Sequence, residues 1–168
     1  MIRCFDSTDL KLIHTLQAKA GDILYSLLYG GKSDLSLRLT NDPLPRRFSF
    51  TDSRAYDLPA QSSAVSLLVA KGPKLQLEID DTKYITGGSE SAGSLLLTET
   101  GAYITAKMSE NTGFDEECWI SLSTWGVVEH QHVGSNRVTF TTWRLVDNSQ
   151  PNEKKIVVAF GDWDHVAA

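Results

Sequence analysis

The stretch ECWISLSTWGVVEHQHVGSNRVTFTTWRLV, residues Glu117 to Val146, decides the predicted fold. It contains three of the four tryptophans and two of the four histidines of the chain. Its first part alternates between two sets of side chains: Cys118, Ile120 and Leu122 in one set, and Trp119, Ser121, Ser123 and Trp125 in the other. Successive side chains of a strand point to opposite faces of a sheet, so this period of two predicts a half-buried β-strand.

The second part of the stretch predicts a β-hairpin. Gly134-Ser135 fits a two-residue type II′ turn, because Gly adopts the positive φ of its first position without a steric penalty. This register pairs three sets of residues: His132 with Arg137, His130 with Thr139, and Val128 with Thr141. A three-residue loop, Gly134 to Asn136, is the alternative, and it would move every side chain of one strand to the other face.

Length and composition predict one ordinary globular domain spanning residues 1–168. Hydrophobic residues make up 41% of the chain and charged residues 22%, which argues against a disordered protein. A net charge of −5 argues against a nucleic-acid-binding protein, which usually carries a basic patch. The two cysteines, Cys4 and Cys118, form no disulfide framework, and no apolar run resembles a signal peptide or a membrane span. We therefore expect a soluble, acidic, cytoplasmic protein with two free thiols and no membrane association.

The N-terminal region predicts a helix over residues 7–29, since apolar residues recur there at steps of three and four. Gly21 lies in its middle and favours a kink or a break, and Gly30-Gly31 ends it. The pattern then changes to period two, as in Leu35, Leu37 and Leu39, and short turns separate the later segments. The expected fold class is α+β, mainly β: an N-terminal amphipathic helix packed on a curved antiparallel sheet or sandwich of about nine or ten short strands.

Two further segments carry local predictions. Residues 87–94, GGSESAGS, consist of small side chains with almost no apolar content, which is typical of a mobile surface loop. The segments 95–99 and 102–107 predict a second hairpin, joined at Thr100-Gly101.

The candidate site residues come mainly from the first stretch. Six of them form a predicted partner-binding surface: Trp119, Trp125, His130, His132, Arg137 and Trp143. Tryptophan is enriched where proteins bind partners, although packing in the core is its more frequent role. A His-x-His pair on one strand face is half of a metal site, and the predicted ligand set is His130, His132, Asp162 and His165, with Asp164 nearby. Two exposed histidines on a polar face are the alternative interpretation.

The sequence supports three functional hypotheses. The first is a non-catalytic protein–protein interaction module of inhibitor or immunity type, binding a macromolecular partner. The second is a small β-rich metal-dependent enzyme that uses the His-x-His strand. The third is a ligand or sugar binder with a tryptophan-lined site. No catalytic residue and no cofactor are predicted, because no nucleophile motif such as Gly-x-Ser-x-Gly occurs.

Overall fold

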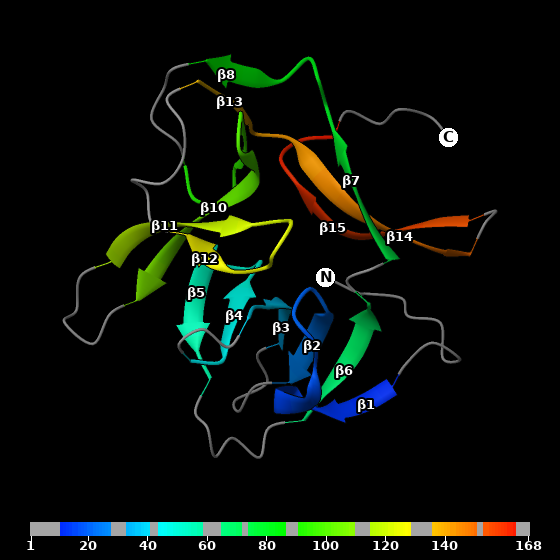
Figure 1. The fold of residues 1–168 in the computed structure, drawn as a ribbon. Coiled ribbons are helices and arrows are strands. Elements are labelled where there is room, and N and C mark those ends of the chain that lie inside the picture. Colours follow the sequence, from blue (N-terminus) through cyan, green and yellow to red (C-terminus); the bar gives the residue numbers. More distant parts are fainter. Residues whose placement is uncertain are drawn as a thin grey trace.

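The computed structural model describes nine ranges of the chain: 11–27, 33–40, 44–58, 65–71, 74–86, 91–109, 115–128, 136–150 and 153–163. These ranges are almost entirely β-structure (Figure 1). In chain order the elements are β1 (Lys11–His14), the short 3₁₀ helix η1 (Thr15–Gln17), β2 (Ile23–Leu27), β3 (Ser33–Arg38), β4 (Arg46–Ser49), β5 (Arg54–Asp57), β6 (Val65–Ala70), β7 (Leu75–Ile79), β8 (Tyr84–Thr86), β9 (Leu95–Thr98), β10 (Gly101–Ser109), β11 (Asp115–Ser121), β12 (Val127–Val128), β13 (Arg137–Phe140), β14 (Trp143–Gln150) and β15 (Glu153–Phe160).

The strands form two sheets. The larger sheet has the order β1-β6-β2-β3-β4-β5-β10-β9-β13-β8, and β11 and β12 branch from it because β11 also pairs with β10. One edge of β10 is shared: its first half pairs antiparallel with β9, and its second half pairs parallel with β5. The sheet is therefore mixed. The smaller sheet has the order β15-β14-β7 and lies beside the larger one (Figure 1).

The predicted N-terminal helix is wrong, and with it the α+β class. Within residues 11–27 the chain forms β1, η1 and β2, and Gly21 lies between the two strands at φ +90°. The Asp22 carboxylate accepts a hydrogen bond from the Lys19 N–H at 2.9 Å and closes a turn that an α-helix does not contain. No helix in the described ranges is long or apolar enough to cross a membrane.

The misleading helical pattern has a physical cause in β2. Ile23 and Leu24 are consecutive, point to opposite faces of the sheet, and are both fully buried. A strand that is apolar on both faces does not alternate, so its sequence resembles a buried helical segment. Tertiary pairing with β3 and β6 then decides the conformation.

One hydrophobic cluster contains residues from both sheets. Trp143 of β14 is fully buried in it, stacks on Phe160 with ring centroids 4.8 Å apart, and donates its indole N–H to the Gly93 carbonyl at 2.8 Å. A second, smaller cluster of Leu96, Tyr103 and Trp119 lies on the other face of β9, β10 and β11. We call this other face of β9, β10 and β11 the outer face.

The two predicted hairpins have opposite outcomes. The 95–107 hairpin is confirmed, since Thr98 of β9 pairs with Gly101 of β10. The hairpin joining residues 127–133 to 136–146 is wrong, because Val128 pairs with Trp119 of β11 and not with Thr141. Strand β13 pairs instead with β8 and β9.

Candidate binding site

The structure separates the three central tryptophans. Trp119 belongs to the outer-face cluster and is only 3% exposed. Trp125 lies in the turn after β11, half-buried, with its indole ring against Gly21: a Cβ atom added to Gly21 would lie 2.5 Å from Trp125 Nε1. Trp143 is 0% exposed in the main core. The structure therefore does not bring these three side chains together on one surface.

The other predicted site residues are less informative. His130, His132, Asp164 and His165 lie outside the described residues, so the histidine pair stays a prediction. Asp162 is exposed, and its backbone carbonyl accepts a hydrogen bond from Lys83 Nζ. Among the residues that the structure describes, no three His, Cys, Asp or Glu side chains gather in a way that could hold a metal ion. Arg137 is half-buried opposite Thr98 of β9.

A pocket of about 280 Å³ lies where β10, β11 and the segment 91–94 meet. Its lining residues come from these three parts of the chain: Ser91, Ala92, Thr105, Ala106, Lys107, Glu117 and Trp119. Trp119 and part of the 87–94 segment were singled out from the sequence, and the pocket brings them together. We call it the Trp119 pocket.

Strand pairing places the charged residues of the Trp119 pocket. Lys107 of β10 lies directly opposite Glu117 of β11, and Thr105 lies opposite Trp119. The other edge of β10 is also held, because the Lys107 backbone N–H donates to the Ser53 carbonyl at 3.0 Å. Lys107 is thus fixed between β5 and β11, so its Cα position does not depend on a ligand.

The segment 91–94 is tied to β10 by hydrogen bonds. Thr105 Oγ1 donates to the Ser91 carbonyl at 2.6 Å, and the Gly93 N–H donates to the Thr105 carbonyl at 2.7 Å. The Trp143 indole N–H holds Gly93 from the core side. Gly93 has φ +92° and fits closely, since an added Cβ atom would lie 2.5 Å from the Phe160 ring. Residues 91–94 belong to no strand, as the loop prediction expects, and the mobility of this loop stays a prediction. Residues 87–90 lie outside the described ranges.

The two charged side chains of the Trp119 pocket are exposed and uncommitted. Within the described ranges, neither the Lys107 ammonium nor the Glu117 carboxylate forms a hydrogen bond or an ion pair. The hydroxyl of Thr105, in contrast, already donates a hydrogen bond to the Ser91 carbonyl. A ligand in this pocket would meet one cationic and one anionic group that are not already engaged.

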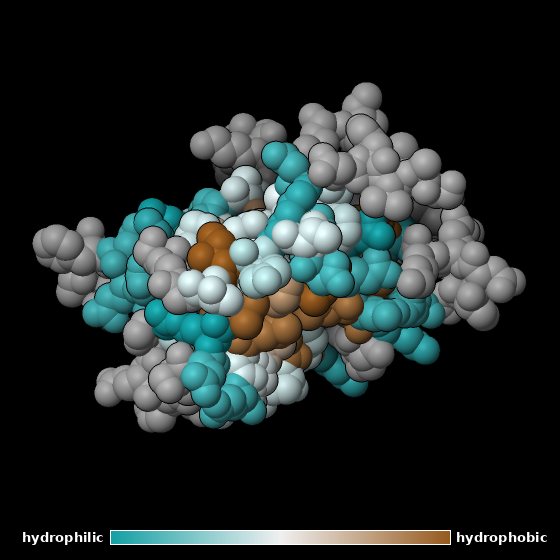
Figure 2. All heavy atoms as spheres, turned by 90° about the horizontal axis from the view of Figure 1, so that it is seen from above, coloured by the Kyte–Doolittle hydropathy of each residue, from teal (hydrophilic) through white to brown (hydrophobic). Residues whose placement is uncertain are grey.

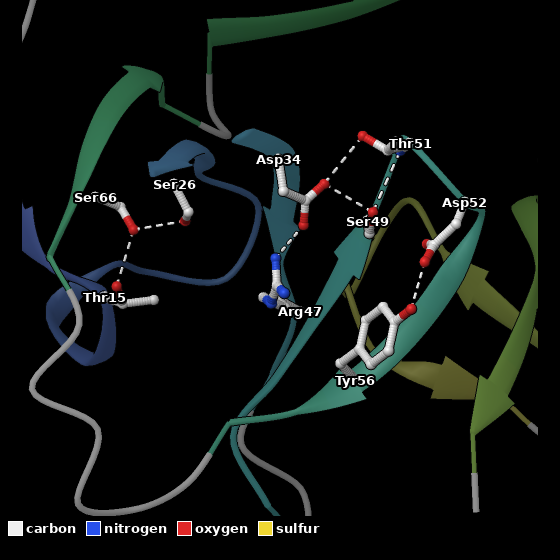
Figure 3. Close-up of polar contacts among 9 residues, drawn as sticks. All are labelled: Thr15, Ser26, Asp34, Arg47, Ser49, Thr51, Asp52, Tyr56 and Ser66. Carbon is white, nitrogen blue, oxygen red and sulfur yellow. Dashed lines mark hydrogen bonds and ion pairs between the residues drawn. The ribbon is translucent and has the colours of Figure 1, made fainter. Parts of the chain in front are cut away.

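A second group of polar side chains lies on the face of β2, β3 and β4 opposite the main core (Figure 3). The Asp34 carboxylate accepts hydrogen bonds from Arg47, from Ser49 Oγ at 2.7 Å and from Thr51 Oγ1 at 3.2 Å. We call these four residues the Asp34 cluster. Asp34 and Ser49 are buried, so this cluster joins β3 to β4 with little access to solvent.

A row of hydroxyl groups continues this polar face. Ser66 Oγ lies 2.8 Å from Ser26 Oγ and 2.9 Å from Thr15 Oγ1, so three elements of the chain share one hydrogen-bonded row (Figure 3). Ser36 lies opposite Ser49 and is 0% exposed, yet its hydroxyl has no hydrogen-bond partner among the residues that the structure describes. Burying a hydroxyl without a partner costs free energy, because the hydrogen bonds that it made to water in the unfolded chain are not replaced.

Two titratable groups near these sites have shifted pKa values. Burial, followed by the hydrogen bond to Asp52, raises the pKa of Tyr56 to about 12. Burial also raises the pKa of the Cys118 thiol to about 11, which keeps it protonated at neutral pH. Cys118 belongs to the main core cluster, so this thiol is not a reactive nucleophile.

Sequence reasoning missed Lys107, Glu117 and the Asp34 cluster. The register between β10 and β11 brings Lys107 opposite Glu117, and no local sequence pattern predicts this register. The alternation of Asp34, Ser36 and Arg38 with leucines was visible, but it did not show that the polar face is buried.

Comparisons with known proteins give no further guide. No family model, curated protein or solved structure matches this chain.

Proposed function

We propose that this protein is a non-catalytic binding protein and that it takes a small ligand in the Trp119 pocket. One observation carries the proposal: a concave site places the Lys107 ammonium and the Glu117 carboxylate, neither paired with any residue that the structure describes, beside apolar wall residues. Ligand sites typically combine an apolar lining with a few polar groups that fix orientation. The volume of about 280 Å³ is close to the lower end of such pockets and suits a small molecule.

The exposure of Trp119 narrows the class of ligand. A sugar binder offers the open face of an aromatic ring for stacking, but Trp119 is 3% exposed and packs against Tyr103, with ring centroids 6.5 Å apart. Its indole therefore forms part of the pocket wall and is not a stacking platform. Recognition by charge and hydrogen bonding fits the site better than recognition by stacking.

A binding screen with a pocket-filling variant tests this proposal. Ala92 is half-buried in the lining, so Ala92→Phe should fill the Trp119 pocket. The matched control is Ala159→Phe, an exposed position on β15 of the other sheet. Ligand-observed NMR would be run against amino acids, monosaccharides, nucleotides and short fatty acids. We expect at least one compound to bind the wild type and Ala159→Phe but not Ala92→Phe. No binding to the wild type, or binding that Ala92→Phe leaves unchanged, would contradict the proposal.

A macromolecular partner is the second candidate, and a different observation favours it. Edge strand β8 carries Tyr84 and Ile85, which are 55% and 45% exposed, and its described pairing is with β13. Figure 2 looks down on the end of the molecule that carries β8 and shows apolar side chains gathered between hydrophilic ones. Exposed sheet edges are places where a partner can add a strand.

Matched charge substitutions test this second candidate. Ile85→Lys should abolish capture of a protein partner, while Ile156→Lys, a similarly exposed position on β15, should preserve it. Equal capture by both variants would exclude β8 as the interaction site. We further propose a cytoplasmic location without nucleic-acid partners, supported by the two cysteines and the net charge of −5.

A further inference from the structure

We infer that the ligand of the Trp119 pocket is a zwitterion of the α-amino-acid class with a small apolar side chain. This inference rests on the proposed function, and it adds the chemical identity of the ligand. In this arrangement Lys107 binds the carboxylate of the ligand, and Glu117 binds its ammonium group.

The pairing of β10 and β11 supplies the charge argument. Lys107 and Glu117 lie directly opposite each other, where cross-strand Cβ atoms are typically about 5 Å apart. The ammonium and carboxylate of an α-amino acid are attached to the same carbon, so one such molecule presents both complementary charges within a similar span. A simple anion would satisfy Lys107 but face Glu117, and a simple cation would satisfy Glu117 but face Lys107.

The protein itself competes little with a ligand for the two charged groups of the Trp119 pocket. Lys107 and Glu117 are both exposed, and no ion pair joins them within the described part of the chain. Even if they paired transiently in solution, an exposed pair of this kind contributes only about 0–1 kcal/mol. Charge-assisted hydrogen bonds to the ligand can therefore replace that interaction.

The remaining lining selects the side chain of the ligand. Ala92 and Trp119 give the pocket an apolar part, while the Thr105 hydroxyl is already bonded to the Ser91 carbonyl. The side chain of Ala106 belongs to the main core on the opposite face of β10. Lys107 and Glu117 are thus the polar groups that a ligand would engage, and an aliphatic side chain of the ligand fits the apolar part of the pocket. The limited volume disfavours a long peptide or a nucleotide.

A comparison of L-leucine with its two blocked forms tests the inference. N-acetyl-L-leucine lacks the ammonium group, and L-leucinamide lacks the carboxylate. We expect L-leucine to shift the amide NMR signals of β10 and β11, and each blocked form to bind roughly tenfold more weakly or worse. Binding of L-leucine should also weaken as the salt concentration rises, because the two charges are exposed.

Charge-neutralising variants assign each end of the ligand. The Glu117→Gln variant should bind L-leucine no better than it binds N-acetyl-L-leucine, because the ammonium group has lost its partner. The Lys107→Met variant should bind L-leucine no better than it binds L-leucinamide, because the carboxylate has lost its partner. Glu116→Gln is the control, since Glu116 is also exposed but lies on the opposite face of β11, opposite Met108. It should leave all three affinities unchanged.

Two results would overturn the inference. One is equal binding of L-leucine and its blocked forms, and the other is no response of β10 and β11 to any amino acid. If the compound screen meanwhile finds a different ligand that Ala92→Phe excludes, the proposed function stands and only the zwitterion is refuted. If the screen finds no ligand at all, both fail.

Discussion

The Asp34 cluster and the Trp119 pocket use similar side chains in opposite ways. In the Asp34 cluster a buried carboxylate accepts hydrogen bonds from Arg47, Ser49 and Thr51, so its acceptors are occupied by the protein itself (Figure 3). In the Trp119 pocket, Lys107 and Glu117 lie opposite each other on neighbouring strands, and neither is engaged within the described ranges. The contrast shows what distinguishes polar groups that hold the fold from polar groups available to a ligand. The distinction lies in whether their hydrogen-bonding capacity is already used within the protein, more than in the residue type.

The largest effect is expected at Asp34. Asp34→Ala would leave the half-buried Arg47 guanidinium without its anionic partner and would remove an acceptor from two hydroxyl groups. Breaking a buried ion pair from one side typically costs about 3–5 kcal/mol of unfolding free energy. Guanidinium denaturation would measure it, with Asp57→Ala as control. The Asp57 side chain is 55% exposed in its pair with Arg46, so its loss should cost at most about 1 kcal/mol. Equal losses in the two variants would remove the distinction between the cluster and a surface ion pair.

Two serines that lie opposite each other give the next test. Ser49 Oγ donates to the Asp34 carboxylate, whereas the hydroxyl of its neighbour Ser36 has no partner in the described part of the chain, although both residues are buried. Ser49→Ala should lower the free energy of unfolding by about 1.5–3 kcal/mol, because it removes a hydrogen bond to a charged group. Ser36→Ala should be neutral or slightly stabilising. If Ser36→Ala proved as costly as Ser49→Ala, this face would not be organised by its hydrogen bonds.

Strand β11 provides a pH-dependent version of the comparison. Its exposed Glu117 lines the Trp119 pocket, while the next residue, Cys118, faces the main core with a pKa raised from 9.0 to about 11. The unfolded chain releases the thiol proton at lower pH than the folded chain. This contribution to stability is therefore complete below pH 9 and is lost as pH rises to about 11.

The expected loss is about 2 kcal/mol at most, measured as the unfolding free energy of the wild type relative to Cys118→Ala across this pH range. Tyr56, whose pKa is about 12, titrates in both proteins and cancels in the difference. Parallel pH profiles for the two proteins would show that the thiol is not buried as the structure describes.

Part of the fold was readable from the sequence. The leucines at positions 35, 37 and 39 follow period two because their side chains pack on one face in the main core. The hairpin of β9 and β10 was readable from the turn at Thr100-Gly101. The region of β2 was not readable, since Ile23 and Leu24 are buried on opposite faces and leave no alternation. Gly21 has a positive φ and also leaves room for the indole ring of Trp125, about a hundred positions further along the chain, and neither requirement is visible in the local sequence.

The candidate site was less predictable than the strands. Trp119 was identified because tryptophans are few and often functional, but its partners depend on the register of β10 and β11. A shift of one residue would have moved Lys107 and Glu117 to different neighbours. The segment 91–94 looked mobile because its side chains are small, and it is held by backbone groups and by the distant Trp143.

The double variant Lys107→Met/Glu117→Gln separates ligand binding from stability, with unfolding and L-leucine binding measured on the same sample. If the two charges serve a ligand and not the fold, the free energy of unfolding should stay within about 0.5 kcal/mol of the wild type while L-leucine binding is lost. A loss of more than about 1 kcal/mol of stability, or binding that remains unchanged, would contradict the account.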